Sequence, residues 1–176
     1  MKKVNTVNSN GVKHCRVEHN SELARMERND CVVRAISTLY DVNYNRAHAF
    51  VKKQFNRKDK DGTRGATMHM DALQEEFGKE WERLGIRYED CITDEERENW
   101  PILERWNRAM IWPWKDKGEI KYAKYTVGKF LKENQVGSFY ILVDSHAFAI
   151  INGVVYGNSD DATALRRRVE SAFRIG

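Results

Sequence analysis

The chain has 176 residues, of which 41% are hydrophobic and 32% are charged, which suits one domain with a buried core. Thirty Lys and Arg residues against 26 Asp and Glu give a net charge of +4, too small and scattered to indicate a nucleic-acid-binding surface. The sequence holds no apolar stretch of membrane-spanning length, and its basic N-terminus lacks the apolar run of a signal peptide.

The three cysteines, Cys15, Cys31 and Cys91, are odd in number and widely spaced. This spacing argues against a secreted disulfide framework and favours a reducing cytoplasm. In such a compartment a cysteine in a structured context is a candidate for chemistry.

Residues 1–28 are mostly polar, and their Asn and Gly residues predict loops, so we expect an N-terminal arm outside the domain. A helix is predicted from Cys31 onward, because apolar residues recur there at helical spacing and Asn29 or Asp30 can cap it. The domain is expected to span residues 29–176.

Two more helices are predicted, one with an apolar stripe from Ala47 to Phe55 and one that begins at Thr67 and is closed by Gly78. The following segment, about residues 79–124, combines many charges with both prolines and all the tryptophans: Trp81, Trp100, Trp106, Trp112 and Trp114. We expect a helical insertion that its tryptophans anchor to the core; the alternative is a tryptophan-lined substrate groove.

In the last third, Thr126 can cap a short helix, and strands are predicted at 139–143, 146–151 and 154–157. Asn152-Gly153 between the last two is a strong hairpin signal. The tail at 168–175 favours a strand over a helix. Helices followed by an antiparallel sheet predict an α+β fold.

Cys31 is the candidate nucleophile, because the first turn of a helix favours a negative charge and therefore the reactive thiolate. His146 is the candidate base, since it begins a strand beside a loop and so combines a rigid mount with access to solvent. The hairpin returns the chain toward His146 at Asn158 and Asp160, and either could orient the imidazole; Asn158 is the first choice.

Two blocks carry a family resemblance: residues 28–37 (RNDCVVRAIS), and residues 137–155 with a His-Ala strand and an Asn-Gly turn. They resemble small papain-like proteins of bacteriophages and prophages, related to the peptidases of bacteriocin exporters. The resemblance implies a helical part carrying Cys31, an antiparallel sheet carrying His146, and thiol chemistry on a peptide, isopeptide or amide bond without a cofactor. Papain-like enzymes commonly have an oxyanion-stabilising Gln where this chain has Arg25, so Asn29 is the substitute, alongside the Cys31 backbone N–H.

The expected partner is a peptide or protein substrate, including a host protein in the host cytoplasm if the chain is phage-encoded. The main alternative is a catalytically silent scaffold that binds such a protein through aromatic and Arg residues such as Trp112, Trp114 and the run at 166–168.

A zinc site at His14, Cys15 and His19 is disfavoured, because no tightly spaced ligand pair is present. We expect no metal, and we expect His48 and His69 to be solvated or capping residues. The sequence carries no signal for the oligomeric state.

Overall fold

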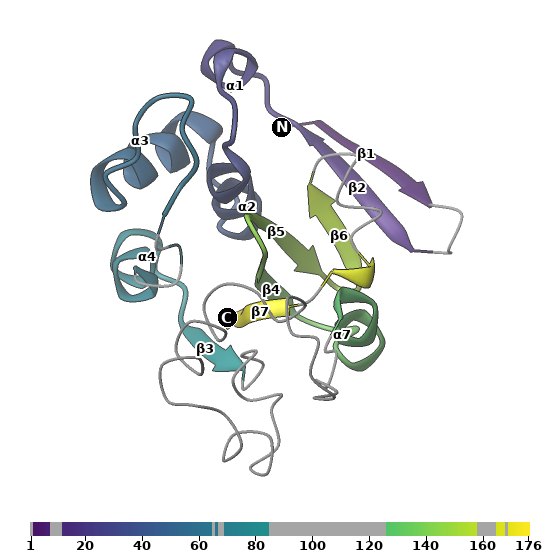
Figure 1. Cartoon of the computed structure of the whole chain (residues 1–176). Helices are drawn as coiled ribbons and strands as arrows, with labels where there is room; N and C mark the ends of the chain where they lie inside the picture. Colours follow the sequence, from purple (N-terminus) through teal and green to yellow (C-terminus); the bar gives the residue numbers. More distant parts are fainter. Residues whose placement is uncertain are drawn as a thin grey trace, which may run out of the picture.

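A computed structural model describes residues 2–7, 12–64, 66, 69–84, 126–157, 165–167 and 169–176. These residues form an α+β fold (Figure 1). The helices are α1 (Glu22–Met26), α2 (Cys31–Leu39), α3 (Tyr44–Gln54), α4 (Met70–Phe77) and α7 (Val127–Glu133). The strands are β1 (Lys2–Val7), β2 (Lys13–Glu18), β3 (Trp81–Leu84), β4 (Ser138–Val143), β5 (His146–Ile151), β6 (Val154–Gly157) and β7 (Val169–Ile175).

Within the described residues, the strands form one seven-stranded sheet in the order β1-β2-β6-β5-β4-β7-β3. Neighbouring strands are antiparallel except β2 and β6, which run parallel. The turn between β5 and β6 consists of Asn152 and Gly153, with φ angles of 49° and 73°. Positive φ at both positions is the backbone twist that suits a two-residue hairpin, so the predicted hairpin is confirmed.

The two faces of the sheet contribute to two different hydrophobic cores. Ala147 and Ala149 of β5 belong to the core that includes residues of α2, α3 and α4. Phe148 and Ile150 belong to the other core, which includes residues of α7. The alternation is that of a strand buried on both faces. Because alanines face α2, this helix can pack closely on β5.

Several local predictions are confirmed. The helix predicted from Cys31 is α2, and α4 ends at Gly78, whose φ of 74° is the left-handed conformation that glycine favours at a helix end. The Thr126 hydroxyl caps α7 by accepting from the backbone N–H of Lys129 at 3.2 Å. The tail forms strand β7.

The N-terminal region differs from the expectation of a polar arm made of loops. Residues 1–28 contain β1, β2 and α1, and β2 joins the sheet beside β6. The inward-facing residues of β2 are Cys15 and Val17, which are 0% and 6% exposed. They alternate with the exposed Arg16 and Glu18 in the pattern of a strand. This alternation is short and lies among polar residues that predict loops, so the strand was missed.

The predicted insertion at 79–124 lies largely outside the described residues, as do Cys91 and the tryptophans from Trp100 onward. Its first part, Trp81–Leu84, is strand β3 and pairs with β7, so this part is not helical. Among the residues that the structure describes, no helix has the length and hydropathy needed to cross a membrane.

Candidate active site

Cys31 and His146 line the same pocket, which has a volume of about 1130 Å³. Its walls come from the start of α2, the segment 55–64 after α3, the turn between β4 and β5, and Glu170 of β7. Asn29 also lines this pocket. The fold therefore brings His146 to the same pocket as Asn29 and Cys31, which lie far earlier in the sequence.

Cys31 is the first residue of α2, as predicted. Asp30 occupies the capping position, but its carboxylate makes no capping hydrogen bond with the helix, contrary to the expectation that Asn29 or Asp30 caps through its side chain. The first N–H groups of a helix have no partner within that helix, so this end of α2 favours a negative charge.

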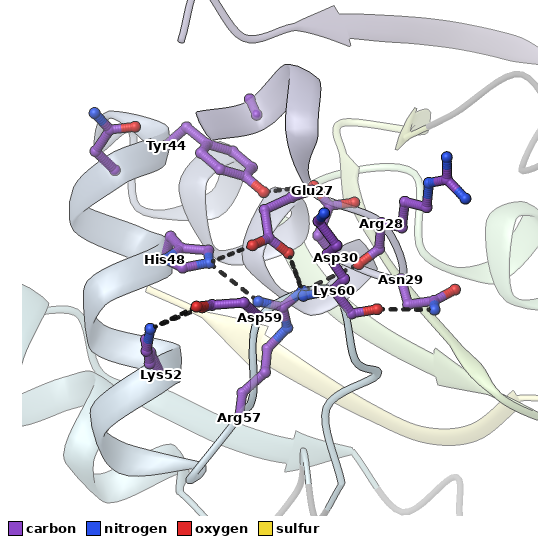
Figure 2. A network of polar contacts seen from close by, with 12 residues as sticks. Glu27, Arg28, Asn29, Asp30, Tyr44, His48, Lys52, Arg57, Asp59 and Lys60 are labelled. Atoms are coloured by element: carbon purple, nitrogen blue, oxygen red, sulfur yellow. Dashed lines mark hydrogen bonds and ion pairs between the residues drawn. The ribbon is translucent and has the colours of Figure 1, made fainter. Parts of the chain in front are cut away.

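The Asp30 carboxylate instead binds two other side chains, those of Arg34 and Tyr44, and Figure 2 shows its contact with Tyr44. It accepts from Arg34 Nε at 2.9 and 3.0 Å and from the Tyr44 hydroxyl at 2.5 Å. Burial alone would raise the pKa of Asp30, but the bonds from Arg34 and Tyr44 lower it below its usual 3.8. The carboxylate next to Cys31 is thus ionised, and the Arg34 charge compensates it.

A second polar cluster lies beside the first and consists of Glu27, His48 and Arg57 (Figure 2). Arg57 Nη2 donates to Glu27 Oε2 at 2.7 Å, and His48 Nε2 lies 3.3 Å from Glu27 Oε1 and 3.1 Å from Arg57 Nη1. Burial acts to raise the pKa of Glu27, but Arg57, the Lys60 amide and His48 together lower it from 4.5. The expectation that His48 is a solvated or capping residue is wrong, because it is only 5% exposed and lies within α3, whose caps are Asn43 and Phe55.

His146 is the first residue of β5 and is half-buried. The centroid of its ring lies 6.1 Å from that of Phe148, two residues along the same strand. These rings share the face of the sheet that packs on α7, whereas Ala147 faces α2. His146 follows the turn at Asp144 and Ser145, where the strand begins, so it borders the pocket at the end of the sheet.

Asn29 lies in the turn before α2 with a φ of 52°, a left-handed conformation that asparagine tolerates better than most residues. Its side-chain amide donates to the Lys60 carbonyl at 3.2 Å. Asn29 thus helps to hold the chain in this structure, and its role as an oxyanion donor stays a prediction. Asn158 and Asp160 lie outside the described residues, so the residue that orients His146 also stays a prediction.

The sequence reasoning missed Glu27 and Arg57, and assigned Asp30 only a capping role. Asp30 and Arg34 are four residues apart on one helix face, a spacing that could have indicated their ion pair. Glu27 and Arg57 are 30 residues apart, and no local pattern connects them.

Ligand atoms of Glu27, His48 and Asp59 lie within 4.8 Å of one another, the one such group of potential metal ligands found in the described ranges. The buried Arg57 guanidinium already contacts Glu27 and His48, so a metal ion would have to displace a cation that is in place. We therefore assign no metal to this group.

Comparisons of the chain with protein-family models, with curated proteins and with solved structures found no match.

Proposed function

We propose that the chain is a thiol-dependent hydrolase of the papain-like type, with Cys31 as the nucleophile and His146 as the general base. The observation that carries the proposal is that these two residues line one pocket. A pocket of about 1130 Å³ offers room for a segment of a peptide or protein substrate.

The layout of the fold supports the same reading. Cys31 begins a helix that packs on β5, and β5 begins with His146 and lies among antiparallel neighbours. A cysteine at a helix start and a histidine at a strand start, both bordering one pocket, are the arrangement expected of papain-like proteins. The start of α2 supports a thiolate, and the Asp30 charge that would oppose it is compensated by Arg34.

In the proposed reaction, His146 takes the proton of the Cys31 thiol and the thiolate attacks the carbonyl carbon of a peptide, isopeptide or amide bond. The backbone N–H of Cys31, with the amide of Asn29, stabilises the resulting oxyanion. The C–N bond then breaks, the leaving amine takes the proton from His146, and a thioester remains. Water activated by His146 hydrolyses the thioester, which frees the acid and restores the thiol.

Asn158 or Asp160 would orient the imidazole of His146 in this reaction. The imidazole must also reach the thiol across the pocket. Hydrogen bonds between catalytic groups are often long before a substrate binds, and tighten in the complex.

The test is the pH dependence of Cys31 alkylation by iodoacetamide, with modified residues located by mass spectrometry. We expect half-maximal reactivity well below pH 8.5, the region typical of a free thiol, and a shift toward that value in His146→Ala. Cys31→Ser checks that the signal comes from this residue and not from Cys91 or from Cys15, which is fully buried.

An ordinary thiol titration in the wild type, unchanged in His146→Ala, would rule out the thiolate–imidazole pair. The catalytically silent scaffold that binds a protein would then be the reading to pursue.

A further inference from the structure

Two segments of the chain run beside each other next to Cys31. The first is the turn 27–30, which leads into α2, and the second is the loop 57–60, which follows α3 and contributes to the pocket wall. Four hydrogen bonds join them (Figure 2). Arg57 Nη2 donates to Glu27 Oε2 at 2.7 Å and to the Arg28 carbonyl at 3.0 Å, the Lys60 N–H donates to Glu27 Oε2 at 2.9 Å, and Asn29 Nδ2 donates to the Lys60 carbonyl at 3.2 Å.

The ion pair at the centre of this contact, Glu27–Arg57, is almost completely buried. The side chain of Arg57 is 0% exposed and that of Glu27 is 3% exposed. Two charges buried so deeply keep their positions only if both remain paired, because a lone buried charge is strongly unfavourable. The pair therefore holds the two segments at one separation.

This contact matters for Cys31 because α2 has no side-chain cap at its start. With no cap of its own, the turn before the helix takes its position from bonds to other parts of the chain. The left-handed backbone of Asn29 is one of the conformations that these bonds maintain.

We propose that Glu27 and Arg57 form a clamp that positions Cys31 against the pocket wall, and that they are positioning residues for the thiol. The clamp joins the turn that directly precedes the nucleophile to the loop that lines the pocket, so the two move together. This inference rests on the proposed function, because it assigns the clamp a role in the reactivity of Cys31.

The test uses two readouts on the full chain. The first is hydrogen exchange of the Lys60 backbone amide, which donates directly to Glu27. The second is the rate of Cys31 alkylation by iodoacetamide at pH 7 and at pH 10, where an ordinary thiol is largely ionised. The variants are Glu27→Gln, which keeps the shape and removes the charge, and Arg57→Lys, which keeps the charge and removes the planar fork.

The matched control is Glu76→Gln. Glu76 accepts from Arg46 at 3.0 Å, so the same substitution is made in an ion pair whose side chains are exposed and are not part of the pocket lining. In the clamp variants we expect Lys60 exchange to accelerate at least tenfold and alkylation at pH 7 to slow at least tenfold, with the pH 10 rate within threefold of wild type. Glu76→Gln should change none of these rates by more than twofold.

The pH 10 rate separates positioning from a merely structural role, because global loosening would raise alkylation at both pH values. Faster Lys60 exchange with unchanged or faster alkylation at pH 7 would overturn the clamp as a positioning device, and so would unchanged exchange. If Glu27→Gln fails to fold, Arg57→Lys decides by the same criteria. Failure of the proposed function appears in the wild type, as an ordinary thiol titration, whereas failure of the clamp alone leaves the wild-type titration low and the variants unchanged.

Discussion

Cys31 and His146 line one pocket, but the regions that carry them are built from different interactions. The Cys31 side is held by buried charges, with the Asp30–Arg34 and Glu27–Arg57 ion pairs beside the turn before α2. The His146 side is held by the β4–β5–β6 ladder and by an apolar core beneath it. Figure 1 shows both regions meeting where α2 lies over β5.

The difference has a physical consequence. An apolar core depends on volume and contact, and it is nearly indifferent to pH. A set of buried ion pairs depends on the charge of each member, so protonation of one carboxylate weakens the whole set. The stability of the Cys31 side, which we call the charged side, should therefore depend on charge and pH. The stability of the His146 side, which we call the packed side, should depend on packing.

The largest expected effect is on the packed side. Phe148 is 1% exposed and belongs to the core between the sheet and α7, so Phe148→Ala should reduce the free energy of unfolding by about 3–5 kcal/mol. The loss should be the same at pH 5 and pH 7, as measured by urea unfolding. Val136→Ala is the control, because Val136 is 80% exposed and should change stability by less than about 0.5 kcal/mol. A loss below about 1 kcal/mol for Phe148→Ala would contradict this account of the core.

The next effect is on the charged side. Asp30→Asn keeps the shape of the side chain but removes the charge that binds Arg34 and accepts from Tyr44, so stability at pH 7 should fall by about 2–3 kcal/mol. The pKa of Asp30 is lowered in the folded state, so its contribution is present above pH 3.8 and is lost as the pH falls through the folded-state value.

The difference in unfolding free energy between wild type and Asp30→Asn should thus become smaller below about pH 4. The corresponding difference for Phe148→Ala should not depend on pH. Glu82→Gln serves as the control, because Glu82 pairs with Arg174 at the surface and such pairs are worth about 0–1 kcal/mol. A difference for Asp30→Asn that is constant with pH would show that shape, and not charge, is what Asp30 contributes.

The packed side was largely predictable from the sequence, and the reason is that its signals are local. Apolar periodicity located α2 and the strands, and the Asn152-Gly153 pair located the hairpin because few residue pairs tolerate its backbone. Cys31 and His146 were found as site candidates for the same reason, since each stands where such an element begins.

The charged side was not predictable, because its contacts join distant segments. Glu27 and Arg57 look like solvated surface residues in the sequence, and only the packing of the turn 27–30 against the loop 57–60 buries them. His48 was misjudged in the same way, since its sequence neighbours are polar while its ring faces the interior. The N-terminal strands were missed because β2 pairs with β6, far away in the chain.

The smallest expected effect is a pH dependence of stability that arises from His19, on the charged side. The ring of His19 lies 5.1 Å from that of Tyr44, and burial together with the nearby Arg34 charge lowers its pKa from 6.5 to about 4. Between these values the unfolded chain binds a proton that the folded chain does not, so stability should rise as the pH increases from 4 to 6.5. Because His19 is only partly buried, we expect a rise of about 2 kcal/mol, less than the full shift implies.

His19→Phe keeps a ring against Tyr44 and removes the His19 titration, so the rise in stability measured by urea unfolding between pH 4 and 7 should shrink by this amount. An NMR titration of the His19 ring checks the same point directly, and a midpoint at pH 6 or above would refute it. The Asp30 charge acts to raise the pKa of His19, so Asp30→Asn should move this midpoint lower still. Phe148→Ala, on the packed side of the pocket, should leave the midpoint where it is, because it changes no charge near His19.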